Sequence, residues 1–207
     1  MEKGADIEEL IIVRHGEPDH IINDLTGGWT NSHLTEMGVQ QASLTGAYLA
    51  TLIGERRLSF YASDLARAVE TAELMATSLP IRPQLTPELR ELNNGQAADL
   101  TNAEAARIVN PIIQPLVDWV PYPEAENWRQ MSERVVGFLE SIKDTEGVTL
   151  LVMHGGSANA AICWWFGLEI GQANISFELD PCSISRFNVN RWGERNAIKI
   201  NDTSHLA

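Results

Sequence analysis

Cysteines, basic residues and long apolar runs are all scarce in this chain of 207 residues. Its two cysteines, Cys163 and Cys182, show none of the short spacings of a zinc site and are too few for a disulfide framework. No apolar run approaches the roughly 18 residues of a membrane span, and residues 1–6 lack the apolar segment of a signal peptide. We therefore expect a cytoplasmic protein with free thiols and no membrane partner.

The scarcity of basic residues also limits the expected partners. The chain has 15 Lys and Arg against 28 Asp and Glu, a formal net charge of −13 at pH 7. A field of this sign repels nucleic acid, so no nucleic-acid partner is expected. An anionic substrate would have to be captured by a local cluster of positive charge.

Three short apolar runs, each followed by a helical pattern, indicate an α/β protein of one domain over residues 1–207. The predicted strands are residues 10–13, 58–62 and 148–153. Thr35 is the expected N-cap of the first helix and Ser63-Asp64 that of the second, while the third helix is expected over residues 157–166. This alternation predicts a mostly parallel central sheet.

Two regions depart from the alternation. Residues 184–189 and 197–200 have the pattern of a hairpin, which would close one edge of the sheet. Residues 96–127 contain four prolines and are predicted to leave the sheet as a lid or specificity insertion. Within this insertion Thr101 begins a capping box, and the prolines are expected to break the helix that follows it.

Polar side chains follow all three predicted strands. Arg14 and His15 end the first strand, Arg67 lies in the first turn of the helix after the second, and His154 follows the third. The carboxyl ends of parallel strands meet at one edge of a sheet, so these four side chains are expected to converge. Two arginines and two histidines beside helix N-termini suit a dianionic phosphoryl group.

Several spaced motifs resemble the histidine phosphatase superfamily, which includes the phosphoglycerate mutases. The motifs are Arg14-His15-Gly16-Glu17, Leu34-Thr35-Glu36-Met37-Gly38 with Gln41-Ala42, Tyr61-Ala62-Ser63-Asp64-Leu65-Ala66-Arg67-Ala68 with Thr71-Ala72, Leu89-Arg90-Glu91-Leu92, His154-Gly155 and the tail Asn201-Asp202-Thr203-Ser204-His205-Leu206. The resemblance implies a phosphoglycerate mutase-like fold, a three-layer α/β/α sandwich with a mostly parallel central sheet.

The resemblance also implies a role for each residue of the cluster. His15 would be the nucleophile that forms a phosphohistidine, with its second ring nitrogen bonded to a backbone acceptor. Arg14, Arg67 and His154 would hold the phosphate oxygens and stabilise their charge in the transition state. Glu91 would act as general acid and then as general base. No metal or cofactor is required.

Some assignments leave alternatives. Glu88 is the second choice for the general acid, because Glu91 stands in the matching Arg-Glu-Leu context. Trp29 could wall the substrate pocket or cap the edge of the core. His20 and His33, which flank the loop around Trp29, are expected to be solvated rather than bound to substrate. The residues expected to contact substrate are Arg14, Arg67, His154, Gly155, Asn23 and Trp29.

The chain also departs from the superfamily pattern. Pro18 replaces a hydroxyl residue that helps to bind phosphate in many members, and Gln96-Ala97-Ala98 replaces an aromatic-acid-Gly element. Gly156 stands where the mutases have Asn. We therefore predict a phosphatase acting on a small phosphorylated metabolite. A phosphomutase and a non-catalytic phosphate-binding regulatory protein remain as alternatives, and a homodimer is one open oligomeric state.

Overall fold

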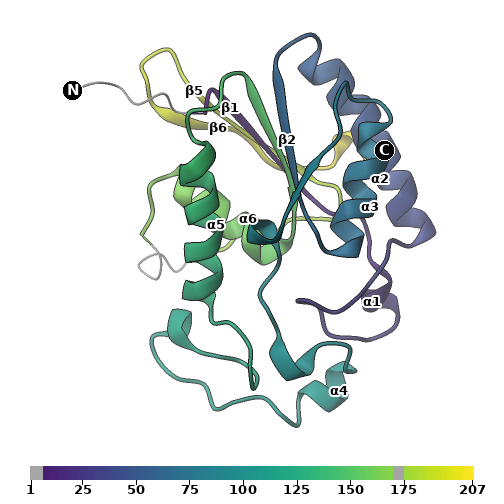
Figure 1. Cartoon of the computed structure of the whole chain (residues 1–207), viewed down its shortest axis with the longest axis vertical. Helices are drawn as coiled ribbons and strands as arrows, with labels where there is room; N and C mark the ends of the chain where they lie inside the picture. Colours follow the sequence, from purple (N-terminus) through teal and green to yellow (C-terminus); the bar gives the residue numbers. More distant parts are fainter. Residues whose placement is uncertain (1–6, 170–174) are drawn as a thin grey trace.

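The computed structural model describes residues 7–169 and 175–207, so the expectation about residues 1–6 lies outside the described residues. A mixed sheet of six strands forms the centre, in the order β3-β2-β4-β1-β5-β6 (Figure 1). The strands are β1 (Glu9–Arg14), β2 (Leu58–Ser63), β3 (Gln84–Thr86), β4 (Val148–Met153), β5 (Ile184–Val189) and β6 (Arg195–Asp202). Strands β1 to β4 run parallel, which confirms the predicted sheet.

Strands β5 and β6 form the hairpin that the sequence predicts. β5 pairs antiparallel with β1, and β6 pairs antiparallel with β5 at the edge of the sheet. Strand β1 therefore has a parallel neighbour, β4, on one side and an antiparallel neighbour, β5, on the other.

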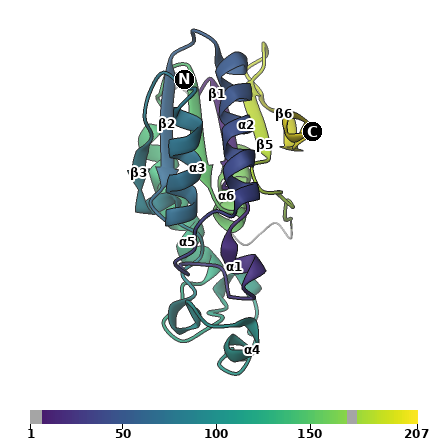
Figure 2. The same ribbon diagram turned by 90° about the vertical axis from the view of Figure 1, so that its right-hand side faces the viewer.

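Helices cover both faces of the sheet, as expected for a three-layer sandwich. Helices α2 (Glu36–Ile53) and α3 (Ala66–Ala76) lie on one face, and α5 (Trp128–Ile142) and α6 (Gly155–Trp165) lie on the other (Figures 1 and 2). Successive side chains of a strand point to opposite faces. Ile11 and Val13 of β1 accordingly join the core under α2 and α3, whereas Leu10 and Ile12 join the core under α5 and α6.

Residues 96–127 have little regular structure and extend from one end of the sheet (Figure 1). The capping box at Thr101 is confirmed, but helix α4 (Asn102–Ala105) has only four residues and ends well before Pro111. Helix α1 (Asp19–Ile22) is equally short, and isolated 3-10 turns occupy residues 87–89, 95–97, 116–118 and 204–206. Among the described residues, none of the helices has the length and apolar character needed to cross a membrane.

The predicted helix starts were right at α2 and wrong at α3 and α6. Thr35 caps α2 as expected, since its hydroxyl accepts a hydrogen bond from Gly38 N. Leu65, rather than Ser63 or Asp64, is the N-cap of α3; the Asp64 carboxylate is paired with Arg90, and the Ser63 hydroxyl accepts from Leu65 N. Helix α6 begins two residues earlier than predicted, with His154 as its N-cap.

Close contact between α2 and α3 depends on a glycine in the middle of α2. A Cβ at Gly46 would lie 2.7 Å from Met75 Cα and 2.9 Å from Met75 O, so no side chain fits there without moving the α3 backbone. Gly137, in the middle of α5, has open space at the same position. The two glycines therefore occupy helices for different reasons.

Replacing each glycine by alanine should change stability in opposite directions. Gly137→Ala should raise the free energy of unfolding by about 1 kcal/mol, because Ala has the higher helix propensity. Gly46→Ala should lower it by about 1–3 kcal/mol, because the overpacking of α2 on α3 outweighs that propensity. Urea denaturation of the two variants checks this, and a rise in stability for Gly46→Ala would contradict the packing explanation.

Candidate active site

The two histidines of the predicted cluster meet because β1 and β4 are parallel neighbours. Arg14 pairs with Met153 in the register, and His15 N donates a hydrogen bond to Met153 O over 2.9 Å. The ring centroids of His15 and His154 are consequently 4.9 Å apart. His15 is 3% exposed and His154 is fully buried, so both imidazoles lie out of bulk water.

His15 has one ring nitrogen on the backbone and one facing an arginine. Its Nδ1 lies 2.7 Å from Gly16 O, and its Nε2 accepts a hydrogen bond from Arg67 Nε over 3.2 Å. Burial, followed by the charges of Arg67 and Arg14, lowers the pKa of His15 well below its usual value. The ring is therefore neutral at pH 7, and the geometry assigns its proton to Nδ1, which leaves the Nε2 lone pair available.

Arg67 brings a buried positive charge to His15. It is 1% exposed, and its other donors reach Gly28 O at 2.7 Å, Thr30 O at 3.2 Å and the Ser32 hydroxyl at 3.3 Å. Burial lowers the pKa of Arg67 to about 10, so the guanidinium is still protonated at neutral pH. All of these partners are uncharged, and such a cation favours an anionic ligand.

Arg14 and His154 each have a buried nitrogen without a hydrogen-bond partner in the part of the chain that the structure describes. These atoms are Arg14 Nε and His154 Nδ1. Other nitrogens of these side chains have partners from distant parts of the sequence, since Arg14 Nη1 donates to Leu179 O and His154 Nε2 lies 2.8 Å from the Ser63 hydroxyl. Buried polar groups usually have a partner, so both nitrogens are suited to bind oxygens of a phosphate.

Glu91 is held at the N-terminus of α6. Its Oε2 accepts a hydrogen bond from Gly156 N over 2.8 Å, and its Oε1 accepts one from Leu92 N over 2.9 Å. A Cβ at Gly156 would lie 2.3 Å from Glu91 Oε1, so this carboxylate position requires glycine there. Glu88 accepts a hydrogen bond from the Thr86 hydroxyl and does not line the cavity, whereas Glu91 does.

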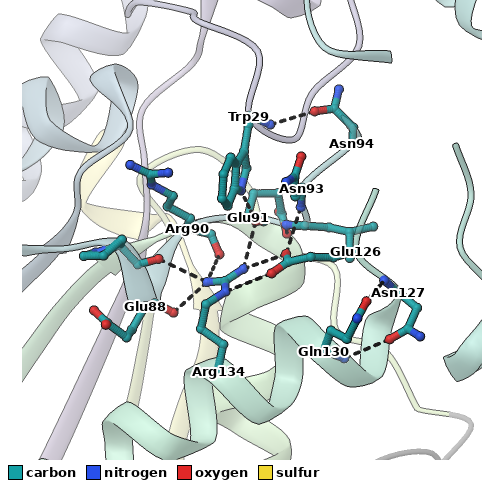
Figure 3. A network of polar contacts seen from close by, with 12 residues as sticks. Trp29, Glu88, Arg90, Glu91, Asn93, Asn94, Glu126, Asn127, Gln130 and Arg134 are labelled. Carbon is teal, nitrogen blue, oxygen red and sulfur yellow. Dashed lines mark hydrogen bonds and ion pairs between the residues drawn. The ribbon is translucent and has the colours of Figure 1, made fainter. Parts of the chain in front are cut away.

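Arg134 of α5 ties down the segment that carries Glu91 (Figure 3). Its guanidinium pairs with the Glu126 carboxylate at 2.8 Å and 3.1 Å. It also donates to four carbonyl oxygens, at Pro87 (3.2 Å), Glu88 (2.8 Å), Arg90 (3.1 Å) and Glu91 (3.2 Å). Sequence reasoning missed Arg134, because an arginine on an amphipathic helix carries no local sign that it is one-fifth exposed and fully bonded.

Trp29 acts on the same segment. Its Nε1 donates to Glu91 O over 2.8 Å, and the Arg90 guanidinium lies over its ring at 4.5 Å from the centroid (Figure 3). Trp29 is not among the residues lining the cavity. It therefore supports the backbone of Glu91, and neither of the two roles considered for it from the sequence describes this.

A cavity of about 1020 Å³ opens beside these residues. Arg14, His15, Arg67, Glu91 and Gly155 line it, and all five were predicted from the sequence. Fully buried His154 lies beside His15 and outside the lining, and exposed Asn23 lies at the C-terminal end of α1, also outside it. The structure thus brings five of the predicted residues to the cavity and leaves Asn23 away from it.

Of the two loop histidines, one was interpreted wrongly. His33 is exposed and paired with Glu70, as expected of a solvated residue. His20 is buried, lines the cavity, and has its Nδ1 2.9 Å from the Ser32 hydroxyl. The burial follows from helix α1, which the sequence did not indicate. Across residues 7–169 and 175–207, no group of three or more His, Cys, Asp or Glu side chains could hold a metal ion.

Comparisons with known proteins find a matching family pattern, relatives of similar sequence and solved structures of similar fold. The sequence pattern of the histidine phosphatase superfamily (branch 1) matches residues 10–203. A 2,3-bisphosphoglycerate-dependent phosphoglycerate mutase from Thermoplasma acidophilum is 31% identical over 203 residues, which cover 93% of this chain and 94% of that protein.

Two solved structures show the same fold. A mycobacterial glucosyl-3-phosphoglycerate phosphatase, solved with VO3, superposes with a TM-score of 0.79 at 20% identity and covers 95% of this chain and 100% of its own. A phosphoserine phosphatase from Entamoeba histolytica, in complex with 3-phosphoglyceric acid, superposes with a TM-score of 0.75 at 23% identity, covering 96% of this chain and 99% of its own.

Acid should destabilise the protein through His20. Burial, and then the charge of Arg67, lowers the pKa of His20 to about 4, against about 6.5 in an unfolded chain. Between these values the unfolded chain binds a proton that the folded chain does not, so the stability present above pH 6.5 is lost as the pH falls towards 4. His20→Gln cannot titrate, so between pH 7 and pH 5 it should lose about 2 kcal/mol less unfolding free energy than the wild type. Urea denaturation at both pH values measures this, and equal losses would refute the role of His20.

Proposed function

The chain belongs to the histidine phosphatase superfamily, and on that premise we propose that it hydrolyses a phosphate monoester in the cytoplasm through a phosphohistidine at His15. The relatives include phosphatases and phosphoglycerate mutases, which share phosphoryl transfer. The observation that carries the proposal is the neutral His15 ring, whose Nδ1 is on Gly16 O and whose Nε2 lies 3.2 Å from Arg67.

In the first step, His15 Nε2 attacks phosphorus. The N–P bond forms as the bond from phosphorus to the ester oxygen breaks, and the leaving oxygen takes a proton from the carboxyl group of Glu91. Arg14 and Arg67 bind the non-bridging oxygens and balance their charge, and the free nitrogen of His154 supplies a further donor. Positive charge develops on the imidazole ring in this step. The hydrogen bond from Nδ1 to Gly16 O stabilises that charge.

In the second step, water attacks the phosphorus of the phosphohistidine. The Glu91 carboxylate takes a proton from this water, the N–P bond breaks, and inorganic phosphate leaves. His15 returns to its neutral form, and the carboxyl of Glu91 is again protonated for the next ester. In both steps the groups that transfer protons and balance charge are supplied by the protein, so the proposed mechanism requires no metal ion.

A phosphomutase is the second candidate, and the 31% identity to a phosphoglycerate mutase supports it. A mutase would transfer the phosphoryl group from His15 to a second hydroxyl rather than to water. Interconversion of 2- and 3-phosphoglycerate in the presence of the bisphosphate would establish that activity. A purely regulatory protein is less well supported, since Arg14, His15, Arg67 and Glu91 all line one cavity.

Replacing the nucleophile should abolish turnover. We expect His15→Ala to hydrolyse p-nitrophenyl phosphate at least about 1,000-fold more slowly than the wild type, because no covalent intermediate can form. The acid-labile phosphoprotein trapped from labelled substrate should disappear with it. His33→Ala is the matched control, since His33 is exposed and paired with Glu70. Undiminished hydrolysis by His15→Ala would refute the proposed function.

The two glutamates should differ in their dependence on the leaving group. Glu91→Gln should lower kcat/KM for an alkyl phosphate by about 100-fold or more, since an alkoxide needs a proton in order to leave. The loss should be much smaller for p-nitrophenyl phosphate, whose phenolate leaves without one. Glu88→Gln should change neither value, because Glu88 does not line the cavity. Equal losses on both substrates for Glu91→Gln would exclude it as the general acid.

A further inference from the structure

The cavity beside His15 is much larger than a phosphate site requires. Its volume is about 1020 Å³, at the upper end of the roughly 300–1,000 Å³ of sites that enclose drug-sized ligands. Arg14, His15 and Arg67 account for one part of its lining. Most of the remainder comes from α5, α6 and two segments, residues 114–117 and 175–180.

This remaining part of the lining is predominantly apolar. Its large apolar side chains include Leu116, Trp128, Val136, Trp164, Ile175 and Phe177. Three of them are unusually exposed, Leu116 at 49%, Trp128 at 38% and Ile175 at 52%. Large apolar side chains that are exposed together around one cavity indicate a ligand that covers them.

The described part of the cavity lining offers few positive charges that could bind a second anionic group on the ligand. Among the lining residues that the structure describes, the Arg and Lys are Arg14 and Arg67, both beside the nucleophile. The nearby guanidinium groups of Arg129 and Arg134 are paired with Asp118 and Glu126 and do not line the cavity.

Three carboxylates besides that of Glu91 line the cavity. They are Glu169, Glu178 and Asp180, which join Glu91 to give four acidic side chains in the lining against two arginines. Once the two arginines hold the phosphate, no further Arg or Lys among the described lining residues is left to pair with a carboxylate on the leaving group, and the acidic side chains disfavour one. A phosphoglycerate has such a carboxylate and too little apolar surface to cover the walls.

We propose that the leaving group of the substrate is a bulky, mainly apolar alcohol without a carboxylate, which packs between α5, α6 and residues 114–117. This inference rests on the proposed hydrolysis at His15 and names the class of ester that the enzyme accepts. Burial of the alcohol against Leu116, Trp128 and Ile175 supplies the binding free energy, while the arginines orient the phosphate.

Three primary alkyl phosphates with similar leaving oxygens separate the effects of size and charge. They are n-propyl phosphate, 3-phenylpropyl phosphate and the phosphate ester of 3-hydroxypropanoate. We expect kcat/KM to be about 30-fold higher for 3-phenylpropyl than for n-propyl phosphate, as burial of one phenyl ring predicts. The carboxylate ester should be at least about tenfold worse than n-propyl phosphate. A preference for the carboxylate ester, or for 3-phosphoglycerate over 3-phenylpropyl phosphate, would overturn the proposal.

A pair of surface-exposed leucines provides matched variants. Leu116 lines the cavity and Leu85 lies in β3 outside it, and each is 49% exposed. Leu116→Ser should lower the ratio of kcat/KM for 3-phenylpropyl to n-propyl phosphate about threefold to tenfold, because part of the apolar wall is lost. Leu85→Ser should leave this ratio unchanged. An unchanged ratio in Leu116→Ser would place the phenyl group elsewhere.

Binding of non-hydrolysable phosphonates tests the cavity independently of turnover. 3-Phenylpropylphosphonate should bind about 30-fold more tightly than n-propylphosphonate by calorimetry. If neither the esters nor p-nitrophenyl phosphate is hydrolysed but this preference is found, the proposed function fails and the ligand class stands. If p-nitrophenyl phosphate is hydrolysed but the phosphonates bind equally, the proposed function stands and the ligand class fails.

Discussion

Parallel pairing of β1 with β4 is the constraint on which the rest of the site depends. The register places Arg14 opposite Met153, so His15 and His154 follow at the same height with their rings 4.9 Å apart. The pairing also encloses both rings between the two helical layers, and this burial is the largest cause of their lowered pKa values. A slip of one residue would turn each side chain of β1 to the opposite face and separate the nucleophile from its partners.

Two buried arginines lie beside His15 although the chain as a whole is acidic, with a formal net charge of −13. Arg67 is almost fully buried and is bonded to His15 and to uncharged oxygens, and Arg14 has a buried nitrogen without a partner among the described residues. The charge of Glu91 favours the protonated form of both arginines, yet burial still lowers the pKa of each, and a bound phosphate dianion offsets that cost of burial. The guanidinium groups of Arg14 and Arg67 are therefore suited to bind an anionic ligand.

Glu91 depends on contacts from three separate parts of the chain. The α6 N-terminus binds its carboxylate, Trp29 bonds its carbonyl, and Arg134 holds the backbone of its segment to α5 (Figure 3). Gly156 stands where the mutases have Asn, and the contact with Glu91 explains this difference. Any side chain at this position would displace the Glu91 carboxylate. The same helices, α5 and α6, also supply apolar side chains to the cavity lining. They therefore position the proposed general acid, Glu91, and form the surface against which the leaving group would pack.

By itself, the sequence determined the three strand–helix units, the parallel part of the sheet and the convergence of Arg14, His15 and Arg67 at one edge of it. Those features follow from local hydrophobic patterns and from the rule that parallel strands place their carboxyl ends at one edge. Only the tertiary structure decided the partners of Asp64, the burial of His20, the backbone role of Trp29 and the network of Arg134. Each of these contacts joins residues separated by many positions in the chain, and hydrogen-bonding side chains carry no local periodicity that names such a partner. The phosphate clamp could therefore be predicted from the residues, whereas the supports of Glu91 and the apolar wall of the cavity could not.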